Sequence, residues 1–90
     1  MQRSDFTSKF EEVCKQRELG FSLHEGDGGG VWYSVELKVG LLEIYIDADN
    51  DVGINLPVEG DSLSFGGCDE VYDDFNNALA RIWVILDSSN

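Results

Sequence analysis

The sequence predicts an α+β fold, a four-stranded antiparallel meander with N- and C-terminal helices packed on one face. Apolar residues repeat with a helical period near both ends of the chain and alternate with polar residues between them. Clusters of glycine and aspartate separate the alternating stretches, as connections between paired strands do. With 90 residues, of which 42% are hydrophobic, the chain can bury one modest core. We therefore expect residues 1–90 to form a single domain.

A first helix is predicted over residues 5–19, because apolar side chains recur along one stripe of this segment. The stripe consists of Phe6, Phe10, Val13 and Cys14. Either Ser4 or Ser8 is expected to cap the N-terminus of the helix. Gly20 stands where a C-capping glycine is expected, so the helix should end just before it.

Four strands are predicted at residues 21–25, 31–39, 41–46 and 52–58, where apolar and polar side chains alternate. The side chains expected on the helix side are Phe21, Leu23, Val31, Tyr33, Val35, Leu37, Val39, Leu42, Ile44, Ile46, Val52, Ile54, Leu56 and Val58. Because proline donates no backbone hydrogen bond, Pro57 is expected to end the fourth strand or to place it at the sheet edge.

A second helix is predicted after the glycine-rich connection at residues 59–67. Its apolar stripe would contain Val71, Phe75, Ala78, Leu79, Ile82, Ile85 and Leu86. Four acidic residues would occupy its first turns, where the positive end of the helix dipole favours carboxylates. These residues are Asp69, Glu70, Asp73 and Asp74.

The charge of the chain is strongly one-sided, with 18 acidic against 6 basic residues and a formal net charge of −12. Residues 39–80 contain ten of the acids and no lysine or arginine. Such a chain repels nucleic acid and anionic membranes, so direct binding to either is not expected. The charge is explained either as a solvated face that keeps a small protein soluble or as a surface that binds a basic protein.

The candidate partner-binding residues combine these carboxylates with aromatic side chains expected on the open face of the sheet. They are Trp32, Glu43, Tyr45, Asp47, Asp49, Asp51, Glu59, Asp61, Asp69, Glu70, Asp73 and Asp74. An apolar anchor inside a polar rim is typical of protein interfaces, and Leu41 would lie beside the aromatic residues. Alternatively, a loop or a second copy covers this face, or a one-residue change of register exchanges the two faces.

No catalytic, metal or cofactor site is predicted. Residues 47–51 have the Asp-x-Asp-x-Asp spacing that opens a calcium loop, but Val52 replaces the required glycine and Val58 the closing glutamate. A hairpin turn is the favoured interpretation. The acidic neighbours of Cys68 and its distance in sequence from His24 disfavour a catalytic cysteine–histidine pair. A chain this short rarely encloses the cleft that paired carboxylates need for hydrolysis, so we expect no enzyme.

The sequence favours a cytoplasmic location. The first residues lack the apolar run of a signal peptide, and no stretch approaches the ~20 apolar residues of a membrane helix. The two cysteines have no C-x-x-C spacing, which disfavours a disulfide scaffold or a zinc site. A reducing compartment is therefore the expected environment.

In length, charge and order of elements, the chain resembles the small immunity proteins that neutralise bacterial toxins, including those of contact-dependent inhibition systems. It is similar in size and charge to barstar-like nuclease inhibitors, although the inferred strand order differs. The resemblance covers the whole chain as architecture and composition, and no residue motif carries it. It implies a tight complex with a basic toxin domain, often a nuclease, whose active site meets the anionic surface.

Two alternative functions remain open. A phage-type DNA mimic that inhibits a restriction or CRISPR enzyme would carry the same acidic surface. A self-associating structural module would instead bury the open face of the sheet against a second copy, which makes a homodimer compatible with the sequence.

Overall fold

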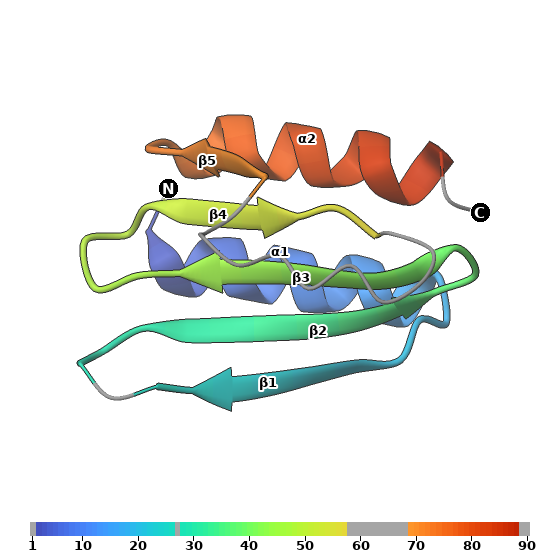
Figure 1. Ribbon diagram of the computed structural model, residues 1–90, viewed down its shortest axis with the longest axis horizontal. Helices are drawn as coiled ribbons and strands as arrows, with labels where there is room; N and C mark the ends of the chain where they lie inside the picture. The colour runs from blue at the N-terminus through green and yellow to red at the C-terminus, as the bar shows by residue number, and fades with distance from the viewer. Residues whose placement is uncertain (1, 27, 58–68, 89–90) are drawn as a thin grey trace.

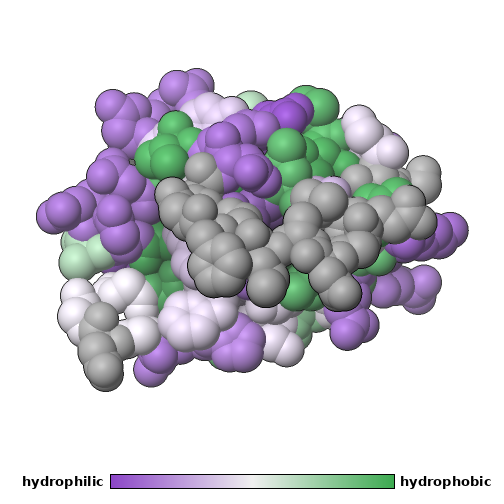
Figure 2. All heavy atoms as spheres, in the orientation of Figure 1, coloured by the Kyte–Doolittle hydropathy of each residue, from purple (hydrophilic) through white to green (hydrophobic). Residues whose placement is uncertain are grey.

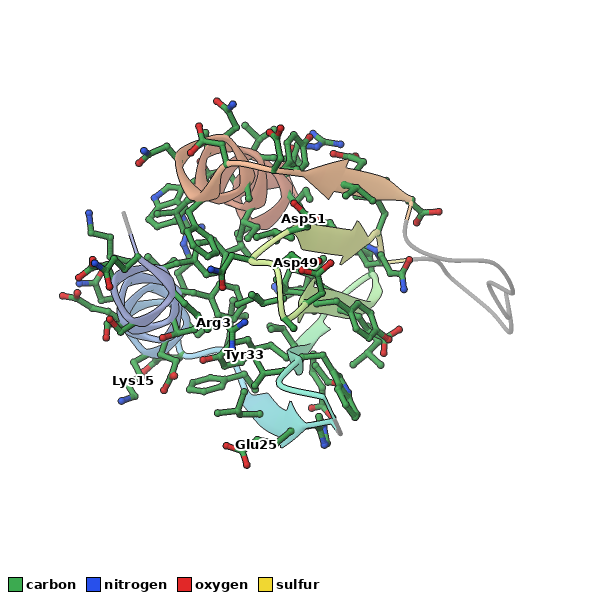
Figure 3. All side chains as sticks on the ribbon, turned by 90° about the vertical axis from the view of Figure 1, so that its left-hand side faces the viewer. Arg3, Lys15, Glu25, Tyr33, Asp49 and Asp51 are labelled. Atoms are coloured by element: carbon green, nitrogen blue, oxygen red, sulfur yellow. The ribbon has the colours of Figure 1, made fainter. Side chains whose placement is uncertain are left out.

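The computed structural model describes residues 2–26, 28–57 and 69–88. The elements follow the chain as α1 (Arg3–Gln16), β1 (Phe21–Glu25), β2 (Val31–Leu37), β3 (Gly40–Ile46), β4 (Val52–Asn55), β5 (Glu70–Tyr72) and α2 (Phe75–Ser88). The strands form one sheet in the order β1-β2-β3-β4-β5, and every neighbouring pair is antiparallel. Both helices lie on the same side of the sheet (Figure 1, Figure 3). The predicted α+β class and meander are confirmed, with a fifth strand that was not predicted.

The alternation of apolar side chains sets the register, and the predicted phase is confirmed. Tyr33 pairs with Ile44 on the helix side, while Trp32 pairs with Tyr45 on the open side. The fully buried side chains of the sheet are Tyr33, Val35, Leu42, Ile44, Ile46, Val52 and Ile54. Each large apolar side chain buried in this way contributes about 1.5–3 kcal/mol relative to an exposed one.

Aromatic rings fasten α1 to the sheet and to α2. The ring centroids of Phe10 and Tyr33 are 4.8 Å apart, and those of Phe6 and Phe75 are 5.1 Å apart. Phe6 and Phe10 are both 0% exposed, and they lie one helical turn apart on the same stripe of α1. The predicted stripe of α1 therefore forms the centre of the core.

The bounds of α1 differ from the prediction at both ends. The helix begins at Arg3, so Gln2, not Ser4 or Ser8, is its N-cap residue. At the other end Glu18 adopts a left-handed conformation with φ 56°. The backbone N–H of Leu19 donates to the Cys14 carbonyl at 2.8 Å, which closes a Schellman motif. Leu19 packs against the core after this turn, and this contact ends the helix before Gly20.

The predicted second and fourth strands extend too far. β2 ends at Leu37, and Val39 lies in the following turn with 47% of its surface exposed. β4 ends at Asn55, before Pro57, and it is not an edge strand, because β5 pairs with it. Val58 lies outside the described residues.

The fifth strand corrects the predicted start of the second helix. Val71 has the right spacing from Phe75 for a helical stripe, yet it lies in β5, 65% exposed. Tyr72 pairs with Val52, so β5 is held by the sheet. The Asp74 side chain then accepts a hydrogen bond from the Asn76 backbone N–H at 3.1 Å, as an N-cap residue does, and the helix begins at Phe75.

Among the described residues, neither helix has the length and apolar character needed to cross a bilayer.

A start of α2 at Phe75 and a start near Asp69 predict opposite effects of one substitution on stability. Asp74→Ala should lower the free energy of unfolding by about 1 kcal/mol, because it removes the N-cap hydrogen bond. If a helix began near Asp69, position 74 would be interior, and alanine would stabilise the protein. Asp73→Ala removes the same charge without a cap and is the control. Urea unfolding of both variants decides between the two helix starts.

Candidate functional site

The open face of the sheet carries a row of paired positions that crosses all five strands. The register pairs His24 with Trp32, Trp32 with Tyr45, Tyr45 with Gly53 and Gly53 with Val71. We call the three ring-bearing residues, His24, Trp32 and Tyr45, the aromatic row. Neighbouring residues on one face of antiparallel strands lie side by side, so the three rings form a row over β1, β2 and β3, and the buried Gly53 separates this row from Val71.

The rings of the aromatic row stack on one another. The centroids of His24 and Trp32 are 5.1 Å apart with the planes 17° from parallel, and those of Trp32 and Tyr45 are 6.2 Å apart at 24°. The Tyr45 hydroxyl donates to the Glu43 carboxylate at 3.0 Å. Stacking and hydrogen bonding fix these side chains before any partner arrives, so little side-chain entropy remains to be lost on binding.

One end of the sheet gathers five aspartates, which we call the aspartate end: Asp47, Asp49, Asp51, Asp73 and Asp74. The paired residues Ile46, Val52 and Tyr72 are the last of their strands at this end. The adjoining residues in the chain, Asp47, Asp51 and Asp73, are therefore neighbours, and the Asp47 backbone N–H donates to the Asp51 carbonyl at 3.0 Å. Each of them lies two residues from a member of the set Tyr45, Gly53 and Val71, so all three are on the same face of the sheet as the aromatic row. Figure 3 views the molecule from this end.

The turn at the aspartate end is built by its own polar groups. An Asp47 carboxylate oxygen accepts the backbone N–H groups of Asp49 and Asp51, each at 2.9 Å. Asn50 takes a left-handed conformation with φ 68°, which asparagine tolerates well. The predicted hairpin turn is confirmed, because the turn joins the antiparallel strands β3 and β4 and the Asp47 carboxylate accepts hydrogen bonds from its backbone.

Arg3 ties the start of α1 to this turn. Its guanidinium donates to the carbonyl oxygens of Gly29 at 2.9 Å and Asp47 at 2.7 Å, and to the Asn50 side-chain oxygen at 2.9 Å. All three acceptors are uncharged. In the described part of the chain, no ion pair includes a residue of the aspartate end. Asp47, Asp49, Asp73 and Asp74 are exposed and Asp51 is partly exposed, with Arg3 as a neighbouring cation (Figure 3).

A second group of acidic and polar residues lies on the other side of the aromatic row. Ser34, Glu43 and Asn55 are paired across β2, β3 and β4. Asp69 joins them, because its backbone N–H donates to the Asn55 side chain at 3.2 Å and its carboxylate accepts the Leu56 N–H at 3.0 Å. Carboxylates therefore flank the aromatic row on both sides. In Figure 2, hydrophilic side chains lie at the left, the top and the right of the molecule, with hydrophobic side chains between them.

Glu70 does not belong to this surface. It lies on the helix side of β5, where Nε and Nη2 of Arg81 in α2 donate hydrogen bonds to its carboxylate, each at 2.9 Å. The Tyr72 hydroxyl donates to the same carboxylate at 2.6 Å. These contacts lower the pKa of Glu70, the hydrogen bond from Arg81 having the largest effect. Glu59 and Asp61 lie outside the described residues.

Among the described residues, no three His, Cys, Asp or Glu side chains converge as metal ligands. Burial, together with the nearby Glu11, raises the pKa of the Cys14 thiol to about 11. The buried Tyr33 donates its hydroxyl to Glu11 at 2.6 Å, and burial followed by this bond raises the pKa of Tyr33 (Figure 3). Both groups resist ionisation and belong to the core.

Sequence reasoning missed the stacking of His24 on the open face and the contacts of Arg3 with the turns at the aspartate end. His24 alternates with Phe21 and Leu23, so its outward position was readable, but its stacking on Trp32 depends on the β1–β2 register. Arg3 left no signal, because two of its three acceptors are backbone carbonyls that any residue would supply.

No protein-family model, curated protein or solved structure matches this chain.

Arg3 should matter for stability. Arg3→Met keeps an unbranched side chain but removes the three hydrogen bonds, so the free energy of unfolding should fall by about 1–2 kcal/mol. Lys9→Met removes a charge from the same helix and is the control. Equal urea midpoints for the two variants would show that the guanidinium contacts contribute nothing.

The Glu70–Arg81 pair should give a defined pH dependence. A carboxyl whose pKa is lowered in the folded state stabilises the fold above its unfolded pKa, and this stabilisation is lost as the pH falls through the folded value. The unfolding free energy of Glu70→Gln should therefore lie below that of the native protein well above pH 4.5, and the difference should vanish in more acidic solution. Urea unfolding over a pH series measures it, and a difference independent of pH would contradict the assignment.

Proposed function

We propose that this chain is a protein-binding inhibitor that covers the active site of a basic protein domain, in the manner of toxin-neutralising immunity proteins. The observation that carries the proposal is the aromatic row with carboxylates on both sides. Stacked rings inside a charged rim combine the two features that protein recognition needs, an apolar anchor and electrostatic complementarity.

The carboxylates would act mainly on the rate of association. Asp49, Asp51 and Asp73 lie at the aspartate end, and no ion pair of the described residues neutralises them. A surface of one sign attracts an oppositely charged site over a distance of about 8 Å at physiological salt. Such steering raises association rates by about 10- to 1,000-fold at low salt. The basic target is a nuclease in the leading version of the proposal, and the carboxylates would then stand where substrate phosphates bind.

The aromatic row would act mainly on dissociation. Trp32 is half-buried and held between His24 and Tyr45, so it can contact a partner without first becoming ordered. Tryptophan and tyrosine are the residues most often found to dominate binding energy at interfaces. Truncating such an anchor costs about 2 kcal/mol or more, which corresponds to a roughly 30-fold faster dissociation.

The first experiment is capture of the partner with the tagged chain as bait in an extract of the source cell, followed by elution with a salt gradient. The proposal expects a basic domain released at high salt, and inhibition of its activity when the purified chain is added. A nucleic-acid-handling enzyme of restriction or CRISPR type would favour the DNA-mimic alternative. Recovery of the bait alone would favour a self-associating module.

Two matched variants then test the surface. Asp49→Asn with Asp73→Asn removes two exposed charges from the aspartate end, and Glu12→Gln with Glu18→Gln removes two exposed charges near α1. Asp47 and Asp74 are left in place, because they hold the turn and the start of α2. The first variant should associate about tenfold more slowly with the captured domain and show a weaker salt dependence.

The glutamine control should retain the native association rate and salt dependence. Trp32→Ala should leave the association rate nearly unchanged and accelerate dissociation. Surface plasmon resonance at several salt concentrations measures both rates. Equal effects of the two charge variants would show that net charge alone is responsible and would remove the open face as the binding site.

A further inference from the structure

The outer edge of β1 is unpaired in the described part of the chain. β1 pairs with β2 on one side, and its residues from Ser22 to Glu25 are exposed. Leu23 is 48% exposed although it lies on the helix side of the sheet, because α1 does not extend over it. Figure 3 shows Glu25 at the lower end of the sheet, away from both helices.

The hydrogen-bond pattern between β1 and β2 determines which backbone groups of β1 point away from the sheet. The Gly26 N–H donates to the Gly30 carbonyl at 2.9 Å, and the Glu36 N–H donates to the Gly20 carbonyl at 3.1 Å. Hydrogen-bonded and non-hydrogen-bonded pairs alternate along an antiparallel ladder, so even-numbered residues of β1 bond to β2. The backbone N–H and C=O groups of Phe21, Leu23 and Glu25 therefore point outward.

The edge also lacks three of the features that usually prevent strand addition. Residues 21–25 contain no proline and no lysine, and the register with β2 runs without a bulge. Natural proteins generally block such an edge with one of these devices or cover it. An unblocked edge with an exposed leucine at its centre is suited to pairing with another strand.

We propose that β1 pairs with β1 of a second copy, antiparallel and about a two-fold axis at Leu23, to form a continuous sheet across a homodimer. In this register Leu23 faces Leu23 of the second copy, Ser22 faces His24, and Phe21 faces Glu25. All the outward backbone groups of the three odd-numbered residues find partners. No like charges lie directly opposite each other, which satisfies the rule for stable cross-strand pairs.

The charge distribution selects this edge and this direction. A parallel pairing in register would place Glu25 beside its own copy, whereas the antiparallel pairing separates the two by about 13 Å, given a rise of 3.2–3.4 Å per residue. The aspartate end begins at β3, so its two copies would lie more than about 20 Å apart at a strand spacing of 4.7–4.9 Å. Both separations exceed the Debye length of about 8 Å. Packing two open faces together would instead bring the aspartates into opposition.

Sedimentation equilibrium at low and high salt tests the dimer. The mass should rise from 10.0 kDa towards twice that value with protein concentration, and the dissociation constant should fall at least several-fold as salt screens the residual repulsion. Binding to a basic partner weakens with salt, so the failure of one idea is distinguishable from the failure of the other. A chain that stays monomeric at millimolar concentration and high salt would overturn the dimer.

Leu23→Pro provides the specific variant. The Leu23 N–H points away from β2, so proline removes an outward donor without breaking the β1–β2 ladder. This variant should remain monomeric with an unchanged circular dichroism spectrum. Should it unfold, Leu23→Lys takes its place, and Val84→Lys on α2, where the native valine is 52% exposed, is the control for both. Dimerisation of folded Leu23 variants with native affinity would contradict the proposal.

Discussion

The pairing of β2 with β3 is the constraint on which the rest of the molecule depends. The register that sets Tyr33 against Ile44 in the core also sets Trp32 against Tyr45 on the other face. A shift of one residue would bury Trp32 and expose the aliphatic side chains, so burial of the core also determines which side chains lie on the open face. One set of contacts thus determines both the stability of the sheet and the chemistry of its open face.

The same register concentrates negative charge, and local interactions offset part of its effect. Arg3 binds carbonyl and amide oxygens of the turns, which fixes the aspartate end while leaving its carboxylates without ion pairs in the described structure. Glu70 shows the other outcome, because Arg81 and Tyr72 surround its carboxylate and connect β5 to α2. Carboxylates close in sequence therefore differ in their contacts: Glu70 is paired with Arg81, whereas Asp73 forms no ion pair among the described residues.

Alternation and helical spacing were sufficient to predict the sheet, the core stripe of α1 and the outward position of Trp32 and Tyr45. They failed at β5, because the spacing from Val71 to Phe75 fits a helix as well as it fits a strand followed by a capped helix. Three residues are too few to show a period. Only the pairing of Tyr72 with Val52 and the cap at Asp74 distinguish the two.

The sequence pattern could not predict which acidic residues lie close together in space, for a different reason. The approach of Asp73 to Asp51 depends on β5 pairing with β4, which the sequence did not indicate. The separation of Glu70 from its acidic neighbours depends on the face of β5 that it occupies, and that face follows from the same unpredicted pairing. A local pattern predicts which face of a helix or strand a side chain lies on. Which side chains lie near one another also depends on how the strands pair.

Contact between the proposed surface and a basic partner can be measured by carbodiimide labelling of carboxylates. The labelling is read by mass spectrometry in the free chain and in its complex with the captured domain. We expect Asp49, Asp51 and Asp73 to lose reactivity in the complex while Glu12 and Glu18 keep theirs. Protection confined to the carboxylates of α1, with the aspartate end still labelled, would contradict it.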